Sequence, residues 1–114
     1  MKEFLVLIRG GHEQMTDLTV AQKEEHMQKW RTYMKALAQK GNLVGGLPLE
    51  DDGRVITKSR VSISVVLSES GEAVGGYLIF KAIDYNHAVE LAKPCPIFEH
   101  NGNLEIREMT PMEM

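Results

Sequence analysis

Apolar residues occur along this chain in short runs and alternations that predict four main strands. Residues 4–8 form a continuous apolar run, which predicts a first strand with both faces covered. A second strand is expected over 43–49, where a proline favours an edge position and paired glycines allow a bulge or a close approach. Residues 77–80 form another continuous apolar run, which predicts a second strand with both faces covered. Alternation of apolar and charged residues over 104–107 predicts a half-buried final strand.

Two helices are predicted between these strands. The longer one is expected over 20–40, because Thr19 and Gln22 have the spacing of a capping box and Gly41 favours a left-handed stop. Asp84 is a good N-cap for a short second helix, which the following prolines end. Along the longer helix, the apolar positions recur at steps of three and four and comprise Val20, Met27, Trp30, Met34 and Leu37.

The order of these elements indicates the fold class. Strand, helix, strand, strand, helix, strand is the split βαβ order of ferredoxin-like α+β domains, an antiparallel sheet with two helices on one face. Alternation over 55–65 predicts an additional half-exposed ribbon in the middle of this order. We expect a single domain over residues 1–108 and a loose tail over 109–114.

The two doubly apolar strands predict a partner for the sheet. Two helices cover only one face, yet residues 4–8 and 77–80 are apolar on both faces. In a chain this short, a second copy of the same sheet is the simplest cover. We therefore predict a homodimer whose sheets face one another, with the strand at 77–80 in the interface. The alternative is that the ribbon folds back over its own sheet.

Composition and charge narrow the class of protein. A chain of 114 residues with 43% hydrophobic residues suits one globular domain with an adequate core. The net charge of −3 comes from interspersed signs, so we expect no nucleic-acid partner and no membrane. The first apolar run is too short for a signal peptide or a membrane span. A single cysteine, Cys95, suits a cytoplasmic protein without disulfides.

Several segments together resemble the YCII-related proteins, and within them the branch called the DGPF group. The likeness covers essentially the whole chain and includes GNLVGGLPL at 41–49 and ESGEAVGGY at 69–77. The resemblance implies a dimeric ferredoxin-like α+β barrel with a cleft between sheet and helix. Where the branch carries Asp-Gly-Pro-Phe, this sequence has SVVL at 64–67, so no role of that tetrapeptide is carried over.

His26 is the first candidate for chemistry. Steps of four, seven and eleven residues lead from it to Trp30, Tyr33 and Leu37, which places its ring at the margin of the apolar helix face. A neutral imidazole there can act as a general base in a cleft. The alternative is a solvated surface histidine. The resemblance implies a catalytic His–Asp pair, and His26 lies where such a His falls, but no Asp partner can be matched.

The remaining candidates are a carboxylate and three aromatic residues. Glu69, beside the strand at 77–80, is expected to act as an acid or orienting group, with plain surface charge as the alternative. Trp30, Tyr33 and Tyr77 are expected to contact a ligand, unless they only fill the core. The histidines have no short pair spacing, so we expect no metal, and no motif indicates a cofactor. They are His12, His26, His87 and His100.

Two classes of function stay open at this point. One is an enzyme that performs cofactor-free acid–base chemistry on a small organic compound, with His26 as the base and Glu69 assisting. The other is a metabolite-binding or regulatory module without chemistry. A dry pocket that contains His26 and a second titratable group would favour the enzyme, whereas a shallow apolar groove would favour the binding module.

Overall fold

The computed structural model describes residues 1–10, 17–50, 52–66 and 74–112, and it confirms the predicted α+β class. Four strands form one antiparallel sheet in the order β2-β5-β1-β6. This is the split βαβ order, with β2 on an edge as its proline suggested. The strands are β1 (Lys2–Arg9), β2 (Leu43–Pro48), β5 (Val74–Ala82) and β6 (Asn103–Glu108).

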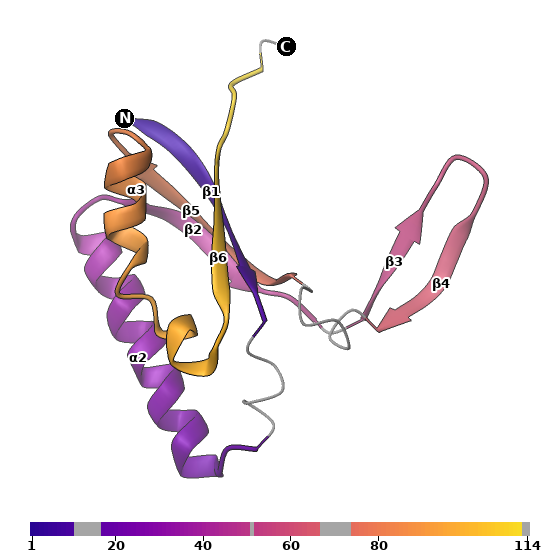
Figure 1. The fold of residues 1–114 in the computed structure, drawn as a ribbon, viewed down its shortest axis with the longest axis horizontal. Coiled ribbons are helices and arrows are strands. Elements are labelled where there is room, and N and C mark those ends of the chain that lie inside the picture. The colour runs from indigo at the N-terminus through magenta and orange to yellow at the C-terminus, as the bar shows by residue number, and fades with distance from the viewer. Residues whose placement is uncertain (11–16, 51, 67–73, 113–114) are drawn as a thin grey trace.

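Both helices lie on the same face of this sheet (Figure 1). They are α2 (Val20–Gln39) and α3 (Tyr85–Ala92), and the short 3₁₀ helix η2 (Pro96–His100) leads from α3 towards β6. None of the described helices is long and apolar enough to cross a membrane.

Local capping explains where the helices begin and end. The Thr19 hydroxyl accepts a hydrogen bond from the Gln22 backbone N–H at 3.1 Å, and Gln22 Oε1 accepts one from the Thr19 N–H at 2.9 Å. Gly41 has φ 77°, the left-handed conformation that stops the helix. Asp84 Oδ1 accepts a hydrogen bond from the His87 N–H at 2.8 Å at the start of α3. All three predicted caps are confirmed.

Alternation along the two central strands builds the core. β1 and β5 pair with Phe4 opposite Phe80 and Val6 opposite Leu78, and these four side chains are fully buried beneath the helices. The helices and η2 contribute the rest of the buried hydrophobic cluster. Those residues are Tyr33, Leu37, Ala88, Ala92, Cys95 and Ile97.

The buried face of α2 differs from the predicted one at its first two turns. Val20 is 86% exposed and Met27 is 44% exposed, although both were expected on the apolar face. The first turn of α2 extends beyond the end of the sheet, which leaves Val20 in solvent, whereas Met27 lies at the margin of the buried face beside His26 (Figure 1). The buried residues of the helix are His26, Tyr33 and Leu37.

The predicted ribbon is a hairpin of β3 (Asp52–Ile56) and β4 (Val61–Val66), which forms a separate two-stranded sheet. It projects on the side of the main sheet away from the helices (Figure 1). On that side lies what we call the open face of the sheet. Its central side chains are only half-buried within one chain and comprise Leu5, Leu7, Tyr77 and Ile79.

Two glycines permit close approaches that shape one end of the molecule. A Cβ on Gly46 would collide with the Tyr77 carbonyl oxygen and the side chain of Leu78, which confirms the predicted close approach between β2 and β5. The register also shifts between Leu43 and Gly45, as expected for a bulge. A Cβ on Gly102, just after η2, would collide with the Ile97 side chain.

Candidate functional site

A cavity of about 250 Å³ lies between α2, the β2–β5 edge of the sheet and η2. We call it the His26 cavity. Gly46 and Gly76 both line it, and Gly76, which alternates along β5 with the buried Leu78, has no side chain to fill the space beneath the helix. A cavity of about 150 Å³ holds benzene, so this volume suits a substituted single ring. Its apolar wall is formed by Ile8, Met27, Trp30, Met34, Leu78 and Ile97.

Three ring side chains form a continuous hydrogen-bonded chain in the wall of this cavity. Trp30 Nε1 donates to His26 Nε2 at 2.9 Å. His26 Nδ1 lies 3.0 Å from His100 Nε2. The two imidazole rings are nearly perpendicular, with centroids 4.3 Å apart and an interplanar angle of 84°. Both nitrogens of His26 are therefore engaged.

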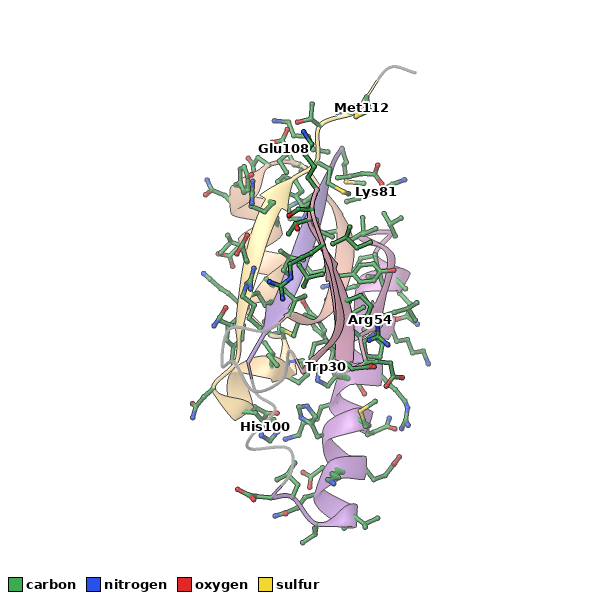
Figure 2. All side chains as sticks on the ribbon, turned by 90° about the vertical axis from the view of Figure 1, so that its right-hand side faces the viewer. Trp30, Arg54, Lys81, His100, Glu108 and Met112 are labelled. Atoms are coloured by element: carbon green, nitrogen blue, oxygen red, sulfur yellow. The ribbon has the colours of Figure 1, made fainter. Side chains whose placement is uncertain are left out.

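The elements around the chain position each ring. His26 and Trp30 are four residues apart and so lie on adjacent turns of the same face of α2. His100 is the last residue of η2, so it reaches His26 across 74 positions of sequence. Figure 2 shows Trp30 and His100 at the same end of the sheet, opposite to Met112. Lys29 Nζ and Glu99 Oε1, 3.0 Å apart, form a second link between α2 and η2.

His26 is buried, and burial favours the neutral form of its ring. Its exposed fraction is 6%, which excludes the alternative of a surface histidine. Desolvation lowers the pKa of His26 below its usual 6.5, and the neighbouring imidazole of His100 and the Lys29 ammonium disfavour a positive charge on it further, while Glu99 opposes the change. At neutral pH the imidazole is thus uncharged, as a general base must be.

The other residues predicted for the site have different surroundings. Tyr77 borders the His26 cavity, although alternation along β5 directs its side chain to the open face. Tyr33 does not line the cavity: its hydroxyl donates to the Leu91 carbonyl at 2.7 Å, towards α3. Glu69 and His12 lie outside the described residues. His87 accepts a hydrogen bond from the Ile83 N–H at 3.0 Å at the start of α3.

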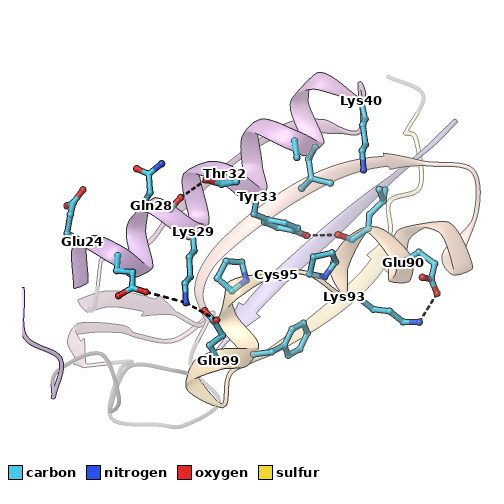
Figure 3. Close-up of a pocket in the computed structure, with 17 residues that line it drawn as sticks. Glu24, Gln28, Lys29, Thr32, Tyr33, Lys40, Glu90, Lys93, Cys95 and Glu99 are labelled. Atoms are coloured by element: carbon cyan, nitrogen blue, oxygen red, sulfur yellow. Dashed lines mark hydrogen bonds and ion pairs between the residues drawn. The ribbon is translucent and has the colours of Figure 1, made fainter. Parts of the chain in front are cut away.

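Tyr33 instead belongs to a second depression, an open groove between α2 and the segment from α3 to η2 (Figure 3). We call it the interhelical groove. Burial raises the pKa of the Cys95 thiol to about 11 and raises the pKa of Tyr33 well above its usual 10. Both groups stay protonated at neutral pH, so neither offers a reactive anion. The interhelical groove is larger, but these two residues give it no base or nucleophile comparable to the neutral His26 of the His26 cavity.

His100 is the site residue that the sequence pattern did not reveal. It follows the two prolines that end the second helix, and no local spacing relates it to His26. Only the 3₁₀ turn of η2, held by the left-handed Asn101 with φ 58°, directs it towards α2. Within the described ranges, no three His, Cys, Asp or Glu side chains lie close enough together to bind a metal ion.

Comparison with known proteins identifies a family and a solved structure of similar fold. The model of the YCII-related domain matches residues 3–113. The chain matches no curated protein. Among solved structures it is similar to 5-chloro-2-hydroxyhydroquinone dehydrochlorinase (TftG) from Burkholderia phenoliruptrix AC1100 in complex with 2,5-dihydroxybenzoquinone. The TM-score is 0.59 at 12% identity, over 95% of this chain and 93% of that chain. At this identity the likeness shows a shared fold.

Proposed function

The chain belongs to the YCII-related family, and on that premise we propose that its His26 cavity binds a small ring compound and exchanges a proton with it. The observation that supports this most is the pair of hydrogen-bonded imidazole rings, the buried His26 and the half-buried His100, in a largely apolar wall. A second titratable group beside His26 favours an enzyme over a binding module that performs no chemistry.

The chemistry of the cavity suggests the kind of ligand. Trp30, Met27 and Met34 offer flat and adaptable apolar contacts, while the imidazoles offer polar ones at a single point. This arrangement suits an aromatic or quinonoid ring with an oxygen substituent. The fold relative was solved with 2,5-dihydroxybenzoquinone, a compound of that kind. Under this proposal His26 is the base and no cofactor takes part.

Glu69 keeps its predicted role in this proposal, whereas Tyr33 does not. Glu69 remains our proposed acid or orienting group, on the strength of its place before β5 in the sequence. For Tyr33, the hydrogen bond to Leu91 supports a packing role in place of the ligand contact expected from the sequence. Trp30 and Tyr77 stay proposed ligand contacts: Trp30 through its ring in the cavity wall, and Tyr77 through the part of β5 that borders the cavity, since its ring is directed to the open face.

We also propose that the folded unit is a homodimer in the cytoplasm. Leu5 lies opposite Ile79 and Leu7 lies opposite Tyr77, so these side chains form an apolar patch on the open face. A two-stranded hairpin is marginally stable alone in water, and β3 carries the exposed Val55 and Ile56. A second copy packed on the open face would cover both features. The single, unpaired cysteine supports a reducing compartment.

A binding experiment with 2,5-dihydroxybenzoquinone tests the proposed site. At a hundred times its dissociation constant the compound should stabilise the fold by about 2.7 kcal/mol, a rise in Tm of about 10 °C. Replacing His26 by Gln should weaken binding at least severalfold. Lys93→Gln, on the rim of the interhelical groove, is the matched control and should bind like the wild type. Equal binding by all three proteins would contradict the proposal.

A further inference from the structure

The donors and acceptors around His26 determine where its ring proton lies. Indole Nε1 of Trp30 can only donate, so His26 Nε2, 2.9 Å away, accepts and carries no proton. A neutral imidazole then has its proton on the other nitrogen, Nδ1. This N–H donates to His100 Nε2 at 3.0 Å, and His100 therefore carries its own proton on Nδ1. The chain runs in one direction, from Trp30 through His26 to His100.

This direction requires both imidazoles to be neutral. A charged His26 would have a second proton on Nε2, facing the indole N–H. A charged His100 would have a proton on Nε2, facing the Nδ1–H of His26. Burial also lowers the pKa of His26 and so favours its neutral form, as this direction requires; Lys29 adds to the effect and Glu99 opposes it. His26 can accept a proton at Nε2 only after Trp30 has withdrawn.

We propose that the indole N–H of Trp30 donates to His26 Nε2 only while no ligand is bound. When a phenol or enol binds, its O–H displaces the indole N–H and donates to the same nitrogen. The inference rests on the proposed function and adds to it that the oxygen substituent of the ligand is a hydroxyl donor. It also gives two residues distinct parts. Trp30 controls access to the base, and His100 is a positioning residue that holds the Nδ1–H of His26.

The proton transfer that follows is balanced within the site. The ligand O–H bond breaks, its electron pair stays on oxygen, and the proton forms a new N–H bond at His26 Nε2. The products are a phenolate or enolate and an imidazolium with protons on both nitrogens. His100 Nε2 continues to accept from Nδ1–H and so orients and stabilises the charged ring, as the third member of a catalytic triad does. Neither an oxidant nor a reductant is needed.

The ligand-free protein allows a test that is independent of any ligand. A long-range ¹H–¹⁵N spectrum of the histidine rings should show a protonated Nδ1 and an unprotonated Nε2 on His26. In Trp30→Phe the indole donor no longer favours the neutral ring, so the titration midpoint of His26 should rise by about 0.5 to 1 pH unit. Tyr85→Phe is the control: it removes a hydroxyl that accepts a hydrogen bond from the Glu108 N–H, does not line the cavity, and should leave the midpoint unchanged.

Two results of that experiment would overturn the assignment. One is a wild-type His26 that carries its proton on Nε2, which decides the matter even if the Trp30 variant folds poorly. The other is a His26 titration that is identical in Trp30→Phe, Tyr85→Phe and the wild type, with the amide spectrum showing that all three are folded.

A pair of related compounds tests the ligand class. Hydroquinone has two O–H donors, whereas 1,4-dimethoxybenzene has the same ring and no donor. Hydroquinone should shift the Trp30 Nε1–H signal and bind at least about tenfold more tightly than the ether. Equal binding of the ether in this cavity contradicts displacement by a hydroxyl. If hydroquinone fails to bind, the ligand class and the proposed function are contradicted, while the tautomer of His26 decides the roles of Trp30 and His100 separately.

Discussion

At the scale of single residues, His26 couples the fold to pH. Its pKa in the folded chain is lowered from 6.5, mainly by burial, so the unfolded chain binds a proton that the folded chain resists. This contribution to stability is complete above pH 6.5. It is lost as the pH falls through the lower pKa of the folded state.

We therefore predict that the free energy of unfolding decreases as the pH falls from 6.5 towards the lower pKa of the folded state, by about 1.4 kcal/mol for each pH unit between these two pKa values. Urea unfolding at a series of pH values measures it. His26→Gln should flatten this part of the profile, because Gln has no proton to gain. A profile of the same steepness in the variant would show that other groups cause the pH dependence.

Gly102 should be intolerant of any side chain. A Cβ there would collide with the Ile97 side chain and lie 2.9 Å from the Arg9 carbonyl oxygen. We predict that Gly102→Ala destabilises the fold by about 1 to 3 kcal/mol and displaces η2, which carries His100. Gly45→Ala is the control, since a Cβ at Gly45 meets nothing within 4 Å. Similar unfolding midpoints in urea for the two variants would refute this reason for the glycine.

The residues of the site were only partly predictable from sequence. Helical spacing related His26 to Trp30 correctly, because residues four apart share a face wherever the helix packs. The same spacing grouped Tyr33 with them, and its ring does lie beside Trp30, but its hydroxyl donates to the Leu91 carbonyl and not into the His26 cavity. His100 could not be found, since its contact with His26 depends on tertiary packing across 74 residues.

At the scale of elements, the capping box of α2 gives a direct test of local structure. Thr19→Ala removes the hydroxyl that accepts from the Gln22 N–H and should lower the free energy of unfolding by about 1 kcal/mol. Thr32→Ala, on the exposed middle of the same helix, also removes a hydroxyl hydrogen bond and should change stability by less than about 0.5 kcal/mol. A larger effect at Thr32 than at Thr19 would contradict the capping argument.

Helix ends that are fixed by capping residues a few positions apart were predicted correctly, whereas features that depend on tertiary packing were not. The caps at Thr19 and Asp84 and the stop at Gly41 act within a few residues, so the sequence alone was sufficient. The exposure of Val20 depends on how far α2 extends past the sheet, which no helical period encodes. The 3₁₀ helix η2 was missed because prolines that end one helix gave no sign of the next turn.

At the scale of the whole molecule, the open face predicts self-association. Ile79→Lys places a charge in the centre of the apolar patch and should convert a dimer to a monomer, with a small effect on the circular dichroism spectrum. Val20→Lys, on the overhanging turn of α2, is the control and should leave the dimer intact. Light scattering at micromolar concentration distinguishes these masses. A wild-type protein with the mass of one chain would contradict the homodimer.

The most direct test of the proposed binding site is a titration of the ¹⁵N-labelled protein with 2,5-dihydroxybenzoquinone, followed by amide and indole chemical shifts. We predict that the largest shifts occur at the Trp30 indole and at the Leu47 and Gly76 amides, which border the His26 cavity. Shifts centred on the interhelical groove, at Lys40 and Leu91, would contradict this site. So would a spectrum that the compound leaves unchanged.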